Sequence, residues 1–133
     1  NGTIINRNVS LIDLPTTILS LVGIKKPKQF LGSNFLTDGR DRIIVSESSE
    51  VDITHLKVNR QKFLIAAIFQ NYKLIYNNIK KQVELYDILK DPYERNNLID
   101  KNNEITQFLF KKIMEYLKII RLRKKPHYKP PKP

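Results

Sequence analysis

Apolar residues recur at helical spacing near the start of the chain. The stripe consists of Leu14, Ile18, Leu21 and Val22. Asp13 precedes it, at a position where a carboxylate caps the free N–H groups of a first helical turn, and Gly23 follows it, where glycine commonly ends a helix. The pattern therefore predicts a short amphipathic helix between Asp13 and Gly23.

The middle of the chain is rich in β-branched and aromatic residues, which are typical of strands. Four segments carry this composition: Arg42–Ser46, Lys62–Phe69, Tyr72–Asn77 and Val83–Ile88. Between the first two, residues 48–59 are polar and acidic, and we expect a loop there. Gln70 and Asn71 offer a tight turn. Because the later strands are joined by short links, we expect an antiparallel meander.

The last regular element is predicted to be a long helix over residues 103–120. Its apolar stripe consists of Ile105, Phe108, Leu109, Ile113, Tyr116, Leu117 and Ile120. Such a stripe packs against a sheet far more often than it holds a ligand. The predicted fold class is therefore α+β, a small antiparallel sheet of three or four strands packed by the long C-terminal helix and preceded by one short helix.

Composition excludes several kinds of site. The chain of 133 residues has no cysteine, so disulfides, cysteine-ligated zinc and a cysteine nucleophile are excluded. No apolar run is long enough for a transmembrane segment. The net charge is +11, but six positive charges and no acid stand in residues 121–133, a proline-rich tail that we expect to be solvated. This distribution argues against nucleic-acid binding by the rest of the chain, although the tail itself suits contact with an anionic lipid, polymer or nucleic acid.

Residues 84–98, with the sequence E-L-Y-D-I-L-K-D-P-Y-E-R-N-N-L, form the most informative stretch. Its physical interpretation is a strand, a turn and a helix start. In that start Asp91 caps, Pro92 takes the first helical position and Glu94 reaches back to the cap. The spacing also resembles the signature E-L-Y-D-L-x-x-D-P-x-E-x-x-N-L near the C-terminus of sulfatases. A capped turn alone does not explain why so many signature positions coincide.

Two further blocks support this resemblance. Residues 9–24 resemble the sulfatase stretch V-S-x-x-D-L-x-P-T-I-L-x-L-x-G-I. They depart from it at Thr16, where the family usually has proline and this chain has Pro15 one residue earlier. Residues 72–77 resemble the family's strand Y-K-Y-I-x-N. With three blocks in the family's order, the chain resembles the C-terminal region of sulfatases, within the alkaline phosphatase superfamily.

The resemblance implies a division of the chain. Residues 1–40 would be the end of the catalytic α/β domain, residues 41–120 a C-terminal α+β subdomain, and residues 121–133 the tail. A missing N-terminal catalytic domain would be the partner, and the absence of an initiator methionine fits a fragment or an excised domain. Because the first helix would then pack on a sheet of that domain, we expect it to expose apolar side chains such as Leu14 and Ile18, together with Leu21.

The resemblance also implies chemistry that we do not find in these residues. Sulfatases use a formylglycine, made from the Cys or Ser of a C/S-x-P-x-R motif, and a divalent cation, typically calcium. This chain has no such motif and no paired acidic run with metal-ligand spacing. We therefore assign it no catalytic residue, no metal ligand and no cofactor of its own. We expect the chain alone to be inactive on sulfate esters, whereas its parent would be a sulfuric ester hydrolase.

The candidate substrate-binding residues are Glu50, His55 and Arg60. The resemblance implies that the C-terminal subdomain lines one wall of the active-site cleft. There these side chains would contact the part of the substrate away from the sulfate, because loops on a rigid sheet often carry recognition. The alternative is a solvated loop with an ordinary histidine.

The predicted function is that of the non-catalytic C-terminal portion of a sulfatase that acts on a sulfated small molecule or glycan. This portion would contribute to stability and to one wall of the substrate cleft. Two other classes stay open at this point. One is a stand-alone binding module that recognises an anionic partner, and the other is part of a phosphotransfer enzyme of the same superfamily.

Overall fold

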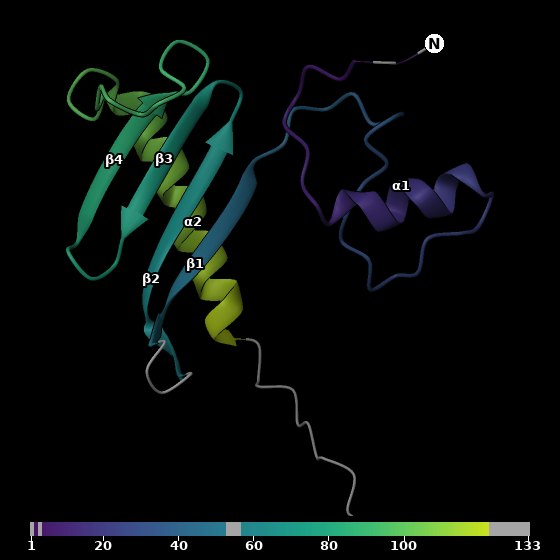
Figure 1. Cartoon of the computed structure of the whole chain (residues 1–133), viewed down its shortest axis with the longest axis horizontal. Coiled ribbons are helices and arrows are strands. Elements are labelled where there is room, and N and C mark those ends of the chain that lie inside the picture. The colour runs from purple at the N-terminus through teal and green to yellow at the C-terminus, as the bar shows by residue number, and fades with distance from the viewer. Residues whose placement is uncertain (1, 3, 53–56, 123–133) are drawn as a thin grey trace, which may run out of the picture.

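The computed structural model describes residue 2, residues 4–52 and residues 57–122. Its N-terminal unit, residues 4–43, holds helix α1 (Asp13–Leu21) and lies beside a sheet packed by one helix (Figure 1). The elements of this second part are β1 (Ile44–Asp52), β2 (Lys57–Phe69), β3 (Tyr72–Asn77), β4 (Gln82–Asp87) and α2 (Asn103–Leu122). The tail was predicted for residues 121–133, but α2 continues to Leu122, and residues 123–133 fall outside the described residues.

The four strands form one antiparallel sheet in the order β1-β2-β3-β4, which confirms the predicted meander. Strands β2 and β3 are joined through Gln70, whose φ of 52° lies in the left-handed region that tight hairpin turns use. The pair Phe69 and Tyr72 closes this hairpin in register. The predicted turn at Gln70 and Asn71 is therefore confirmed.

The core lies between the sheet and α2, which covers one face of the sheet (Figure 1). Alternation along β2 places Ile65 and Ala67 on the covered face. The fully buried cluster consists of Ile65, Ala67, Leu74, Leu85, Leu109 and Ile113. Each large aliphatic side chain buried in this way contributes about 1.5–3 kcal/mol relative to exposure. The α+β prediction is confirmed. Of the stripe predicted for the last helix, Leu109 and Ile113 are fully buried, whereas Phe108 is 37% exposed.

The loop predicted for residues 48–59 is wrong in large part. Strand β1 continues to Asp52, and β2 begins at Lys57, so this region is a β-hairpin. Glu50 pairs with Asn59, whereas Ser49 pairs with Phe63, so the register shifts between these two pairs. Backbone pairing with a neighbouring strand, rather than apolar content, sets the length of these strands.

The helix predicted to start at Asp91 is also wrong, because α2 begins only at Asn103. The Asp91 carboxylate accepts hydrogen bonds from the backbone N–H groups of Arg95 and Asn96, at 2.7 and 2.8 Å. Glu94 has a φ of 55°, which interrupts a right-handed helix. The segment is therefore a loop closed by the side chain of Asp91.

The same loop covers the free edge of β4. The Asn97 side-chain oxygen accepts the Leu85 N–H at 3.0 Å, and the Leu98 N–H donates to the Leu85 carbonyl at 2.7 Å. These bonds satisfy both backbone groups of a residue on an edge strand, which protects the sheet from pairing with another chain. In this structure the signature residues Asp91 and Asn97 hold the chain's own backbone.

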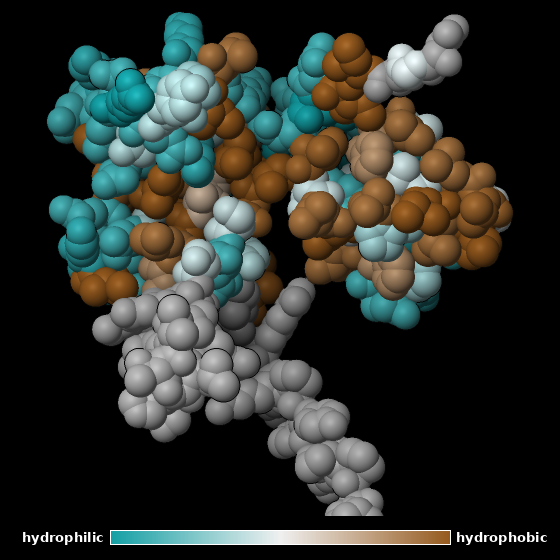
Figure 2. Space-filling model, in the orientation of Figure 1, coloured by the Kyte–Doolittle hydropathy of each residue, from teal (hydrophilic) through white to brown (hydrophobic). Residues whose placement is uncertain are grey.

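Helix α1 buries polar side chains and exposes apolar ones. Its buried residues are polar, namely Asp13, Thr16 and Thr17. Its apolar stripe faces solvent, with Leu14 48%, Ile18 51% and Leu21 68% exposed. Figure 2 shows hydrophobic side chains gathered over this unit. The predicted exposure of the stripe is confirmed, and polar contacts rather than an apolar core hold this helix.

Candidate functional site

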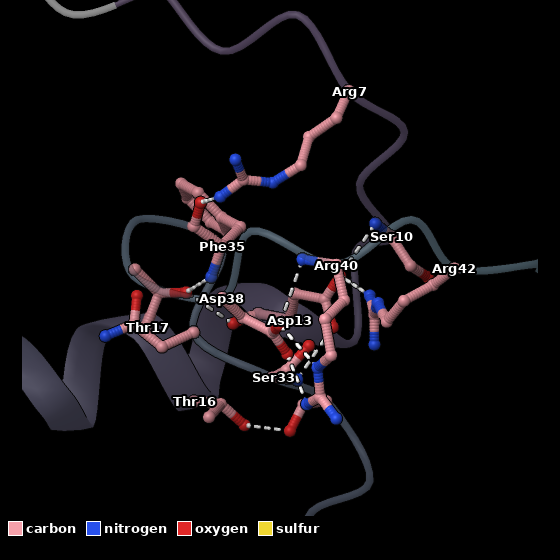
Figure 3. Close-up of polar contacts among 12 residues, drawn as sticks. Arg7, Ser10, Asp13, Thr16, Thr17, Ser33, Phe35, Asp38, Arg40 and Arg42 are labelled. Carbon is pink, nitrogen blue, oxygen red and sulfur yellow. Dashed lines mark hydrogen bonds and ion pairs between the residues drawn. The ribbon is translucent and has the colours of Figure 1, made fainter. Parts of the chain in front are cut away.

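The densest polar cluster of the N-terminal unit is centred on the buried carboxylate of Asp13 (Figure 3). We call it the Asp13 cluster, consisting of Ser10, Asp13, Ser33 and Arg42. The carboxylate accepts the backbone N–H groups of Ser10 and Ser33, each at 2.9 Å, and pairs with the Arg42 guanidinium. One side chain thus joins the segment before α1, the segment after α1 and the approach to β1.

Asp13 was predicted to be a helix cap, and this prediction is wrong. Ile12 occupies the capping position and makes no side-chain cap bond, while Asp13 is already the first helical residue. Its carboxylate accepts the N–H of Ser10, three residues earlier, instead of an N–H within the first turn. The Asp13 side chain therefore ties separate segments together. Gly23, with a φ of 72°, lies just beyond the helix end, as predicted.

A second layer of hydrogen bonds holds the segment after α1. The Thr17 hydroxyl donates to the Asp13 carbonyl at 2.9 Å and accepts the Phe35 N–H at 3.2 Å. The Thr16 hydroxyl donates to the Gly32 carbonyl at 3.2 Å. Gly32 leaves no room for a side chain, because a Cβ there would stand 1.9 Å from the carbonyl oxygen of Ile12. Residues 32–35 are therefore packed against the polar face of α1.

Two further arginines border the cluster (Figure 3). Arg40 forms a two-point ion pair with Asp38, with both bonds at 2.8 Å, and the hydrogen bonds from Arg40 hold the pKa of Asp38 well below its usual range. Arg7 donates to the Phe35 carbonyl. The Arg40 side chain is exposed, so its pair with Asp38 is screened by solvent.

The Asp13 carboxylate has a structural role and is not placed to react with a substrate. Burial alone would raise the pKa of Asp13, but the hydrogen bonds from Ser10 and Ser33 and the charge of Arg42 outweigh it and lower that pKa. The carboxylate is therefore ionised at neutral pH, with both of its oxygens hydrogen-bonded. A general base or a nucleophile needs a lone pair facing a substrate, and the Asp13 side chain is fully buried.

The structure places only the backbone of two predicted binding residues. Glu50 lies in β1 opposite Asn59, and Arg60 lies in β2 at the register shift. The side chains of Glu50 and Arg60 are not described, and His55 falls outside the described residues. Their role in substrate binding stays a prediction, and for Glu50 and Arg60 it now concerns two paired strands instead of a loop.

Within the described ranges, no three His, Cys, Asp or Glu side chains converge to form a metal site. The calcium and the formylglycine that the resemblance implies therefore have no assigned residues among them. None of the helices in that part of the chain is long and apolar enough to cross a membrane.

Sequence reasoning missed a second polar feature, a hollow of about 450 Å³. It lies where the N-terminal segment meets the β2–β3 turn, and we call it the seam pocket. Asn8 crosses this seam and donates from its side-chain nitrogen to the Gln70 carbonyl at 2.8 Å. These two residues stand 62 positions apart in the chain, and no local pattern links them.

Comparison with solved structures shows which known proteins share this fold. A structure of BT4656, in complex with its substrate D-glucosamine-2-N,6-O-disulfate, matches with a TM-score of 0.62 and 21% identity over 88% of this chain and 25% of that one. A structure of Ps i-CgsB in complex with k-i-k-neocarrahexaose matches with a TM-score of 0.66 and 17% identity, over 83% of this chain and 24% of that one. A structure of BT1596, a 2-O GAG sulfatase, matches with a TM-score of 0.57 and 22% identity, over 81% of this chain and 24% of that one.

The chain thus spans about a quarter of the length of these structures, and it shares their fold in that part. No curated protein sequence matches the chain significantly. The sequence profile of a family described as N-sulphoglucosamine sulphohydrolase, C-terminal, matches residues 1–122. The chain belongs to this family and is the C-terminal portion of a sulfatase.

Proposed function

We propose that this chain is the non-catalytic C-terminal region of an enzyme that removes sulfate from a sulfated sugar or glycan. Its tasks are to pack against the catalytic domain and to form one wall of the substrate cleft. The formylglycine and the divalent cation of the reaction would belong to the catalytic domain. The ligands of two structural relatives, a disulfated glucosamine and a neocarrahexaose, support a sugar as the substrate class.

The packing role is supported by helix α1, whose polar side is buried and whose apolar side is exposed. A carboxylate and two threonines fix its polar side inside the unit, so its apolar stripe is presented outward in a defined orientation. Exposed apolar patches of this kind mark surfaces that another protein surface covers. The matched structures are about three and a half times as long as the chain, so they contain further protein able to supply such a cover.

Replacing Ile18 with alanine tests this packing role in two contexts. In the 133-residue chain alone, where Ile18 is 51% exposed, the free energy of unfolding should change by less than about 0.5 kcal/mol. In the complete product of the gene, the same change should cost about 2–4 kcal/mol, because it would empty a buried site.

The matched control is Ile79→Ala, because Ile79 is 52% exposed and lies in the β3–β4 turn. It should have a small effect in both contexts, as measured by urea unfolding. Equal, small effects of Ile18→Ala in both proteins would contradict the packing role.

The cleft wall is proposed for residues 50–60 of the chain, which include Glu50 in β1, Arg60 in β2 and, between these strands in the sequence, His55. Alanine at these positions in the complete enzyme should change KM for the sulfated sugar more than kcat, because the side chains would contact the substrate away from the reacting sulfur. Unchanged kinetic constants in all three variants would leave the hairpin without this role.

A further inference from the structure

The seam pocket is built from separate segments of the chain. Its polar lining comes from the N-terminal segment, from the approach to β1 and from the β2–β3 turn, and consists of Asn6, Arg7, Asn8, Asp41, Gln70 and Asn71. Ile88 and Leu89, which follow β4, complete it with aliphatic surface. A volume of about 450 Å³ lies within the range of small-molecule sites, about 300–1,000 Å³.

Hydrogen bonds to the protein's own backbone hold the walls of this pocket in place. Arg7 donates to the Phe35 carbonyl, and Asn8 donates to the Gln70 carbonyl. On the opposite side, the Ile88 N–H donates to the Asn71 carbonyl at 2.8 Å. The lining groups are therefore positioned before any ligand arrives, which lowers the cost of binding.

The lining keeps hydrogen-bonding capacity that these contacts do not use. Among the described residues, Arg7 uses one of its five N–H donors on the Phe35 carbonyl, and the side-chain oxygen of Asn8 accepts no hydrogen bond. Within the described residues, the Asn6 side chain has no hydrogen-bond partner, and the Asp41 carboxylate accepts only a long bond of 3.5 Å from Gln70. Donors and acceptors thus face the same hollow.

The balance of charges indicates the kind of ligand. One guanidinium and one carboxylate offset each other, and the other four polar groups are neutral carboxamides, of which that of Asn71 is hydrogen-bonded to Asp87 and that of Gln70 to Asp41. A carboxamide presents a donor and an acceptor side by side, which matches the paired donor and acceptor character of neighbouring hydroxyl groups. The aliphatic surface of Leu89 suits the C–H face of a sugar ring. A neutral, polyhydroxylated ring fits this lining better than an anion does.

We propose that the seam pocket is a carbohydrate-binding site that holds an unsulfated sugar residue through its hydroxyl groups. The identification of this residue as part of the enzyme's glycan rests on the proposed function. The binding of a neutral sugar does not rest on it. The site would let the protein hold a glycan at a position that carries no sulfate.

The test measures binding of chitobiose and lactose to the complete product of the gene by saturation-transfer NMR and calorimetry. Asn6→Ala and Asp41→Ala should each weaken binding of the preferred disaccharide at least tenfold. Neither side chain belongs to the bonds that frame the pocket, so both variants should fold normally. Asn96→Ala and Asp100→Ala remove an exposed amide and an exposed carboxylate elsewhere and should leave binding unchanged.

Absence of binding of both disaccharides would overturn the inference, as would binding that Asn6→Ala and Asp41→Ala leave unchanged. Release of inorganic sulfate from a sulfated sugar is measured in the same preparations. Sulfate release without sugar binding at this pocket would refute the inference and support the proposed function. Sugar binding that depends on the pocket, without sulfate release, would support the carbohydrate site and refute the proposed function.

Discussion

Replacing Asp13 with asparagine should loosen the N-terminal unit without unfolding the sheet. The carboxylate is fully buried and serves three donors, the backbone N–H groups of Ser10 and Ser33 and the guanidinium of Arg42. An amide keeps one acceptor oxygen and turns an NH₂ group toward donors that the second oxygen had served. The substitution therefore breaks an ion pair and leaves a backbone N–H facing another donor.

The expected cost follows from these contacts. Hydrogen bonds to a charged group contribute about 1.5–3 kcal/mol each, and breaking a buried ion pair costs about 3–5 kcal/mol. Arg42 keeps 27% of its side-chain surface in contact with solvent and can be rehydrated, so we expect about 3 kcal/mol. This cost should fall on the N-terminal unit, because Asp13 makes no contact with the core between the sheet and α2.

Hydrogen exchange measured residue by residue checks this expectation. A cost of about 3 kcal/mol corresponds to a loss of protection of roughly a hundredfold at amides of α1, such as that of Val22, whose N–H donates to the Ile18 carbonyl. Amides of β2 and β3 should keep their protection. Glu115→Gln is the control, because it removes an exposed carboxylate that pairs with Lys112 on α2, away from the N-terminal unit. Unchanged protection in α1, or an equal loss in the sheet, would refute the role assigned to Asp13.

Two further outcomes follow from the same unit. The pKa of Asp13 is lowered in the folded protein, so the stabilisation by this carboxylate is present above the unfolded pKa of about 4 and is lost as the pH falls through the folded pKa. Hydrogen-exchange protection of α1 should therefore hold from pH 5 to 8 and drop below about pH 4. The same loss of protection at low pH in Asp13→Asn would contradict this prediction. Gly32→Ala should destabilise the unit by about 1–3 kcal/mol, because the added Cβ would meet backbone atoms of Ile12 and Asp13. Gly39→Ala is the control, since open space surrounds Gly39, and it should leave thermal unfolding unchanged. Equal effects of the two substitutions would contradict the close approach at Gly32.

Much of the fold could be predicted from the sequence, because periodicity reports directly on which face of an element is buried. The alternation in β2 and the stripe of α2 both turn toward one core, as at Ile65 and Leu109. The exposure of Ile18 was predicted as well, although it breaks the usual rule that apolar residues are buried.

The wrong predictions have different physical causes. Asp13 is a residue type that commonly caps helices, but Ser33 and Arg42 bind its carboxylate from 20 and 29 positions away, and no local pattern marks such bonds. Asp91 bonds locally, to the N–H groups of Arg95 and Asn96, and closes a loop instead of starting a helix. The seam pocket has the same origin as the bonds of Asp13, since only the fold brings Asn8 to Gln70.

The central claim is that this chain belongs to a sulfatase whose chemistry resides in other residues. It is tested most directly by measuring inorganic sulfate released from a sulfated glucosamine, with calcium present, by the complete gene product and by the 133-residue chain. The account predicts sulfate release by the complete product and none by the chain alone. Turnover by the isolated chain, or its absence from the complete product across sulfated sugars, would contradict it.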